Sequence, residues 1–198
     1  MIDHKNKVIF AHAPKTGGTS VEKLFPDGFG PQHHPLSWFK KQRPHIYKKY
    51  FKFSICRNPY DKMVSEYFWH VHDPLNQFKG RFQDLPFNNF VKLFFQIDSS
   101  FLEFKYKGWF DMHFETHRMP QTLLLDPVSD LDFVIRFENF QEGFNNLCDK
   151  IGARRQKLPH KNKTKHKPYA EYYDDETKQI IAEKYAKDIE YFGYGFGE

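Results

Sequence analysis

The sequence of 198 residues is poor in cysteine, with only Cys56 and Cys148. Two thiols do not make a disulfide scaffold, so we interpret both as reduced core residues and expect a reducing compartment, the cytoplasm. No stretch approaches the roughly 20 consecutive apolar residues that cross a bilayer, and no signal peptide precedes the first apolar run. The sequence therefore predicts a soluble cytoplasmic protein without a transmembrane segment.

Several common functional signatures are also missing. The chain has no Walker A order, G-x-x-x-x-G-K-[ST], because Lys15 precedes both glycines of its glycine pair. No motif that reads DNA or RNA accompanies the basic residues, so we expect no nucleic-acid partner. His113 and His117 have helical spacing, but Phe114 stands where H-E-x-x-H has its glutamate, and no third ligand is evident. We predict that the protein holds no metal.

A glycine-rich loop follows an apolar run near the start of the chain, in the stretch VIFAHAPKTGGTS. The apolar residues 8–10 are followed by Pro14 and by Gly17 and Gly18, which predicts a buried strand, a loop and then a helix. Glycines let main-chain N–H groups close around an anion, while a lysine adds charge and hydroxyls add donors. The sequence predicts an anion site here, and the alternative is a plain turn with a solvated lysine. The candidate residues are Pro14, Lys15, Thr16, Gly17, Gly18, Thr19 and Ser20.

A second strand, loop and helix follow in FKFSICRNPYDKMVSEYFW. The apolar and aromatic residues 51–55 predict a strand, and Arg57 at its end can form a forked pair with a phosphate. Ser65 lies about two turns into the following helix, so it reaches the same anion only if the ligand lies along that helix. The alternative for Arg57 is a structural ion pair with Asp61 or Glu66.

The alternation of strands and helices predicts an α/β fold with a mostly parallel central sheet flanked by helices, the three-layer arrangement of P-loop proteins. A chain of this length can bury its core as a single domain, residues 1–198. Ligands in such folds bind at the carboxyl ends of the strands, where both motifs lie. The expected strands are 7–11, 51–55 and 132–136, and the expected helices are 18–25, 35–42, 59–71, 86–97, 138–150 and 174–191.

The blocks PKTGGTS and RNPYDKMVSEY together resemble the sulfotransferase family, specifically its membrane-type carbohydrate branch. The later stretches LPHKNKTKHKPY and YYDDETKQIIAEKYAKDIEYFGYGF are similar to the closing loop and helix of that family, so the resemblance covers nearly the whole chain. It implies an enzyme that uses 3′-phosphoadenosine 5′-phosphosulfate (PAPS), transfers its sulfonate group to an acceptor hydroxyl and releases adenosine 3′,5′-bisphosphate (PAP).

The resemblance also implies roles for particular residues. The loop Lys15 to Ser20 takes the 5′-phosphosulfate, and Arg57 with Ser65 takes the 3′-phosphate. A flap over the cofactor is formed by Asn162, Lys163, Thr164 and Lys165. The basic segment around this flap, residues 154–167, has two other interpretations, namely a solvated loop and a surface for phosphate-rich polymers.

The reaction needs a base for the acceptor hydroxyl and a charge that stabilises the leaving phosphate. We assign the second role to Lys15. The family carries its base histidine between the two cofactor blocks, which points to the pair His33 and His34 in HHPLSWFKK. His34 aligns better by its spacing to Ser37 and Lys40, and His33 is the alternative. The region where the family contacts its acceptor contains the candidate residues His113, His117, Arg118 and Gln121.

The sequence departs from the family pattern in three respects, of which the third, the short chain without long insertions, leaves the acceptor open. Ala13 replaces a larger apolar residue, Cys56 replaces a common valine, and the chain lacks the long insertions that help animal members grip a polysaccharide. Our preferred acceptor is the hydroxyl of a carbohydrate, a glycan or glycoconjugate. The alternatives are a small P-loop kinase that uses ATP and Mg²⁺, and a non-enzymatic module that binds anionic polymers through residues 154–167.

Overall fold

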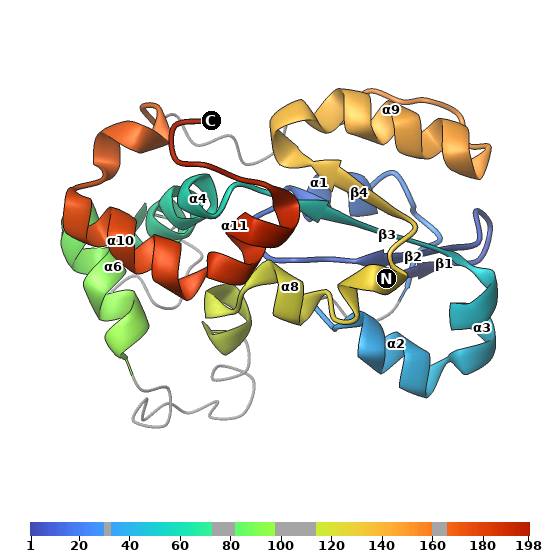
Figure 1. Ribbon diagram of the computed structural model, residues 1–198. Helices are drawn as coiled ribbons and strands as arrows, with labels where there is room; N and C mark the ends of the chain where they lie inside the picture. The colour runs from blue at the N-terminus through green and yellow to red at the C-terminus, as the bar shows by residue number, and fades with distance from the viewer. Residues whose placement is uncertain (30–32, 73–81, 98–113, 160–165) are drawn as a thin grey trace. The chain divides into compact units, whose positions relative to one another are not determined.

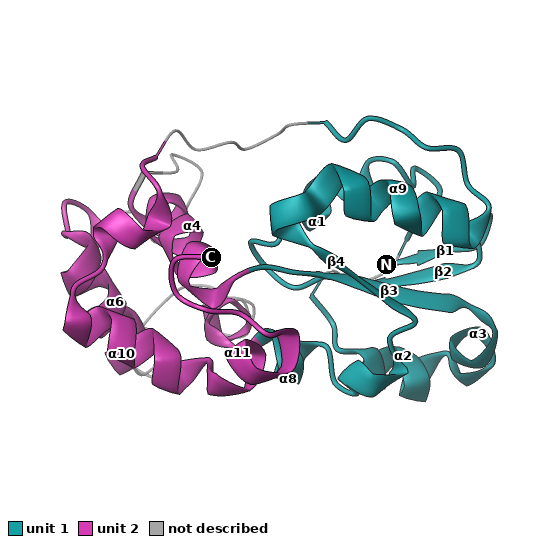
Figure 2. Cartoon of the chain, turned by 45° about the horizontal axis from the view of Figure 1, so that its top comes forward, with its two compact units in different colours: residues 1–57, 121–163 teal, residues 58–120, 164–198 magenta. Residues whose placement is uncertain are grey.

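The computed structural model describes residues 1–29, 33–72, 82–97, 114–159 and 166–198 (Figure 1). The chain forms two compact units, each built from two stretches (Figure 2). Unit 1 consists of Met1–Arg57 and Gln121–Lys163, and unit 2 of Asn58–Pro120 and Thr164–Glu198. Each unit has its own cluster of buried apolar side chains. The single domain over residues 1–198 stays a prediction.

Unit 1 contains a four-stranded sheet with the order β1-β2-β3-β4. The strands are β1 (Ile2–Asp3), β2 (Val8–Ala11), β3 (Phe51–Cys56) and β4 (Phe133–Arg136). β2, β3 and β4 run parallel, and β1 pairs antiparallel with β2. This confirms the predicted α/β fold with a mostly parallel sheet. The sequence analysis missed β1 because a strand of two residues shows no periodicity.

Helices cover both faces of this sheet. They are α1 (Gly18–Glu22), α2 (Leu36–Gln42), α3 (Pro44–Lys49), the short α8 (Gln121–Leu124) and α9 (Phe140–Ile151). Figures 1 and 2 show α1 and α9 on one face and α2 and α3 on the other. The core under α9 joins Phe53 and Ile55 of the sheet to Phe144 and Leu147 of the helix. The helix α3 was not predicted, and Pro44 at its first turn suits a helix start.

Unit 2 is helical in its described part, with α4 (Pro59–His72), α6 (Phe87–Gln96), α10 (Asp175–Lys184) and α11 (Ala186–Phe192). In α6 the buried residues Phe87, Phe90, Val91 and Phe94 fall at helical spacing, so one face of the helix enters the core. The predicted single helix 174–191 is wrong, because the chain breaks at Tyr185, where ψ is 25°. This tyrosine is buried, and its hydroxyl donates to the Arg118 carbonyl at 3.1 Å.

The membrane-spanning potential of the helices and the state of the two cysteines bear on the composition of the chain. Within the described ranges, no helix has both the length and the apolar character that crossing a membrane requires. Cys56 and Cys148 are both buried free thiols, as predicted.

Candidate active site

The predicted anion loop connects the end of β2 to α1 and curls tightly on itself. Lys15 and Gly17 have positive φ angles of 62° and 84°, which fold the main chain into the kind of concave turn that binds anions. The Thr16 hydroxyl is buried and donates to the Ala13 carbonyl at 2.8 Å. The Ser20 N–H donates to the Gly17 carbonyl at 3.0 Å. Thr16 therefore closes the loop with its side chain.

The two glycines of the loop have no room for a side chain. A Cβ atom on Gly17 would lie 2.9 Å from a ring carbon of Phe140, and one on Gly18 would lie 2.2 Å from the His12 imidazole. Real Cβ contacts are not this short, so a larger residue at either position would force the Phe140 or His12 ring to shift, and φ of 84° at Gly17 adds main-chain strain there. The loop thus offers bare main chain at these points, which suits a ligand that binds backbone N–H groups, such as a phosphate.

Arg57 is attached directly to this loop. Its Nη1 donates to the Lys15 carbonyl at 2.8 Å, and its guanidinium lies 4.2 Å from the centroid of the Phe137 ring. Gln121 fixes the main chain of Arg57 from both sides, because its Oε1 accepts the Arg57 N–H and its Nε2 donates to the Arg57 carbonyl, both at 2.9 Å. The structure therefore joins the two sequence motifs, since the cation of the second contacts the loop of the first.

The helix after the loop is shorter than predicted. α1 spans Gly18–Glu22, whereas the sequence analysis expected a helix over 18–25. A helix this short contributes little dipole, so positive charge near the loop comes from its amides and from Lys15 and Arg57.

Three histidines lie near the loop or on the segment that precedes α2. His33 Nδ1 is 3.0 Å from the His12 carbonyl oxygen, and the rings of His33 and His12 are 4.5 Å apart. His34 instead packs edge-on against Trp38, with ring centroids 4.9 Å apart. The structure therefore places His33 beside His12, which lies two positions before Pro14, the first residue of the anion loop.

His12 was not identified from the sequence. Its side chain is 5% exposed, and its Nδ1 lies 3.0 Å from Glu22 Oε1 of α1. It also stacks on Phe10, with ring centroids 5.3 Å apart. Its position directly before the loop was the sequence feature that indicated a place near the site. No spacing of residues in the sequence indicated Glu22 as its partner.

The residues predicted to bind the acceptor make intramolecular contacts. His117 is buried, and its Nδ1 lies 2.8 Å from Glu66 Oε2 in unit 2. The Arg118 guanidinium donates to the Ile97 carbonyl at 2.6 Å and pairs with Glu115. Gln121 holds Arg57 in unit 1, and His113 lies outside the described residues. An acceptor role for these four residues stays a prediction.

The remaining residues predicted to bind the cofactor are Ser65 and the four residues of the flap. Ser65 is half-buried on α4 in unit 2. The predicted flap, Asn162, Lys163, Thr164 and Lys165, lies outside the described residues. The roles of all five stay predictions.

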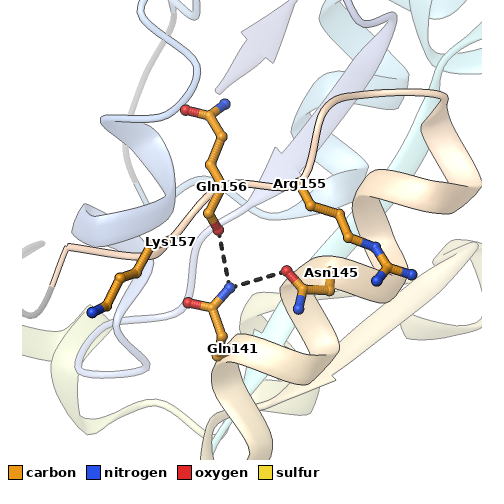
Figure 3. A pocket seen from close by; sticks show the side chains of 5 residues that line it. All are labelled: Gln141, Asn145, Arg155, Gln156 and Lys157. Carbon is orange, nitrogen blue, oxygen red and sulfur yellow. Dashed lines mark hydrogen bonds between the residues drawn. The ribbon is translucent and has the colours of Figure 1, made fainter.

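A polar pocket of about 460 Å³ lies between α9 and the segment after it. Gln141 Nε2 donates to Asn145 Oδ1 and to the Gln156 carbonyl, both at 3.0 Å. Figure 3 shows the side chains of Arg155, Gln156 and Lys157 pointing in different directions. Arg155 pairs with Asp149 through two bonds of 2.9 and 2.5 Å. Hydrogen bonds with Gln141 hold residues 156–158 against α9. The side-chain donors around the pocket do not converge on one point.

A buried cluster in unit 2 contains side chains of the kind that bind metals. Ligand atoms of Glu66, His70 and His117 all lie within 4.8 Å of one another. The ammonium of Lys62, however, is 3.1 Å from Glu66 Oε1 and donates to the His117 carbonyl at 2.7 Å. Lys62 thus balances the carboxylate charge without an ion. The expectation of no metal stays a prediction.

The family model described as the sulfotransferase family matches residues 1–195. Among solved structures, the chain is similar to mouse sulfotransferase SULT7A1 complexed with PAP. The TM-score is 0.57 and the identity 12%, over 96% of this chain and 86% of that chain, so this likeness shows the fold. No match was found among curated protein sequences.

Proposed function

Since the chain belongs to the sulfotransferase family, we propose that it transfers the sulfonate group of PAPS to a hydroxyl of a carbohydrate acceptor. When bound, PAPS supplies the sulfonate group and a PAP leaving group. The family establishes sulfonate transfer, and the carbohydrate acceptor and the residue roles below are the proposal. The cytoplasmic location expected from the sequence belongs to the same proposal.

The bond between Arg57 Nη1 and the Lys15 carbonyl supports the cofactor site most strongly. It brings the guanidinium of Arg57, a buried residue, to a loop in which an added Cβ on either glycine would meet a neighbouring ring. Main-chain amides and a fixed arginine are the donors that phosphate groups prefer. We assign the 5′-phosphosulfate to the loop from Lys15 to Ser20 and the 3′-phosphate to Arg57. Lys15 stabilises the negative charge that develops on the leaving oxygen.

We assign the general base to His33. A carbonyl oxygen only accepts hydrogen bonds, so the contact with the His12 carbonyl places a hydrogen on His33 Nδ1. In the neutral ring Nε2 then carries the lone pair that takes the acceptor proton. His34, which the sequence spacing favoured, has its ring against Trp38 and is the alternative base.

The first test is calorimetric titration with PAP, and separately with ATP plus Mg²⁺, on the wild-type chain and on Lys15→Ala and Arg57→Ala. We expect metal-independent binding of PAP that both substitutions weaken. Lys48→Ala is the matched control, because this exposed lysine on α3 lies outside the proposed site. Preference for ATP with Mg²⁺ would indicate the kinase instead. Binding of anionic polymers that is indifferent to Lys15 would indicate the non-enzymatic module.

The second test measures sulfonate transfer from labelled PAPS to a panel of neutral and acidic glycans. His33→Ala should lower kcat by about 10²- to 10⁴-fold, the usual range for loss of a general base, while PAP affinity is retained. Loss of activity in His34→Ala, with His33→Ala fully active, would transfer the role to His34. Transfer to non-carbohydrate hydroxyls alone would contradict the proposed acceptor class.

A further inference from the structure

The pair of His12 and Glu22 has no role in the site as described so far, yet His12 packs against both Gly18 of the anion loop and His33. The pair is largely enclosed, with 5% of the His12 side chain and 14% of the Glu22 side chain exposed. His12 comes directly after β2, and Glu22 is the last residue of α1. The pair therefore connects the two elements on either side of the loop.

The hydrogen positions in this pair follow from its partners. An ionised carboxylate only accepts, so Glu22 Oε1 receives a hydrogen from His12 Nδ1 at 3.0 Å. His12 contacts His33 in two ways, through its carbonyl oxygen at 3.0 Å from His33 Nδ1 and through its ring, 4.5 Å from the His33 ring. The His12 residue thus links the negatively charged Glu22 carboxylate to the proposed base, His33.

The position of the His12 ring is restricted on its other sides. Phe10 stacks on it with an interplanar angle of 15°, and Gly18 packs so closely that an added Cβ would collide with its Cδ2 and Nε2 atoms. With Glu22 holding Nδ1, the ring has one orientation, and it forms a fixed surface beside His33.

We propose that Glu22 and His12 are positioning residues for His33. Glu22 orients the His12 ring, His12 orients His33, and the Glu22 carboxylate stabilises the positive charge that His33 acquires when it takes the acceptor proton. The proton moves from the acceptor hydroxyl to His33 Nε2, the acceptor oxygen forms the new bond to sulfur, and the electron pair of the broken S–O bond leaves with PAP. This inference rests on the proposed function.

A double-mutant cycle between Glu22 and His33 tests the inference. Gln at position 22 keeps an oxygen that accepts from His12 Nδ1 but loses the charge, so we expect Glu22→Gln to lower kcat about tenfold, and Glu22→Ala about 100-fold. The PAP affinity of both variants should stay within about twofold of the wild-type value, because Glu22 is not assigned to the cofactor site. In the His33→Ala background, Glu22→Gln should cause no further loss, because it acts through the missing base.

The control is Glu142→Gln, which removes the same charge from an exposed position on α9 of the same unit. If Glu22→Gln lowers kcat equally with and without His33, or weakens PAP binding, its role is to support the loop and the inference is overturned. Normal kcat in both Glu22 variants also overturns it. Failure of the proposed function has a different signature, which is absence of PAP binding or full activity of His33→Ala in the wild-type background.

Discussion

At the scale of single residues, the site depends on the absence of a side chain as much as on charged groups. Gly18 has no positive φ angle to explain it, yet the His12 ring occupies the space that its Cβ would need. A methyl group there must displace either the imidazole or the loop. The two glycines therefore suit their positions for different reasons. Gly18 packs closely against His12, and Gly17 has a left-handed main-chain conformation.

Gly18→Ala should consequently damage the site. Overpacking of this kind costs about 1–3 kcal/mol in the free energy of unfolding. We expect the shift of the loop to lower PAP affinity, and the shift of the His12 ring to lower kcat, each by about tenfold or more. Calorimetry and transfer assays provide the check. Gly152→Ala is the matched control, because Gly152 has φ of 68° but nothing within 4 Å of an added Cβ. It should reduce stability by about 1 kcal/mol from backbone strain and leave PAP affinity unchanged. Equal effects of the two variants on PAP binding would argue against the packing explanation.

At the scale of elements, buried charges on one helix are balanced locally. Lys62 and Glu66 of α4 are one helical turn apart and 1% and 0% exposed, and their pairing at 3.1 Å leaves little uncompensated charge in the unit 2 core. Glu66 also accepts from His117, so one carboxylate serves two partners.

Replacing this carboxylate should destabilise the protein strongly. Glu66→Gln keeps the shape but leaves the Lys62 charge without its counter-charge, and we expect a loss of about 3–5 kcal/mol in the free energy of unfolding, measured by urea denaturation. The double variant Lys62→Met with Glu66→Gln removes both charges and should recover most of that loss. A double variant that is as unstable as Glu66→Gln would show that charge balance is not the cause.

A second element-scale contact joins α2 and α3 to the turn before β4. The Asp130 carboxylate accepts from the Tyr47 hydroxyl at 2.7 Å and from Lys40 at 3.1 Å. The hydrogen bond from Tyr47, followed by that from Lys40, lowers the pKa of Asp130 below its ordinary value of 3.8. A lowered folded-state pKa stabilises the protein above pH 3.8, and the stabilisation is lost as the pH falls through the lowered value.

Asp130→Asn should therefore reduce the free energy of unfolding at pH 7 by about 1 kcal/mol, the scale of one ordinary hydrogen bond. The difference from the wild-type chain should shrink as the pH falls below 3.8, because protonation removes the same charge from the native carboxyl. Urea denaturation curves of both chains from pH 7 down to the acid limit of folding would check this. A difference that is constant with pH would contradict it.

At the scale of the whole molecule, the sequence predicted the elements that carry strong periodicity. The three parallel strands and the long helices α4, α6 and α9 lie within two residues of their expected limits. In the described part of the chain, the missed elements include β1, α3 and α8, whose lengths of two to six residues leave no repeating pattern.

The site was predictable only in part, for a physical reason. The loop and Arg57 are motifs in the sequence, and the structure joins them. The contacts of His12 with Glu22 and His33 depend on how a loop and a helix fold back on a strand, and no local pattern contains that information. The break at the buried Tyr185 likewise has no helix-stop signal, since the sequence has neither glycine nor proline there.

Cofactor binding should stabilise the whole molecule by mass action. At a PAP concentration of 100 times its dissociation constant, the free energy of unfolding should rise by about 2.7 kcal/mol. Thermal unfolding monitored by circular dichroism should show a higher Tm with PAP, and no increase at the same concentration for Lys15→Ala with Arg57→Ala. An equal increase in that double variant would place the PAP site elsewhere.

The paired amide bonds between Gln121 and Arg57 have one further consequence. The chain leaves unit 1 directly after Arg57 and returns at Gln121, so these two bonds of 2.9 Å close the base of the intervening excursion, Asn58–Pro120. Because its ends are clamped together, lengthening such an excursion costs little closure entropy, which grows only with the logarithm of its length. The two bonds fix the ends of this stretch at the sheet, so the position of Arg57 beside the anion loop is held independently of how long the stretch is.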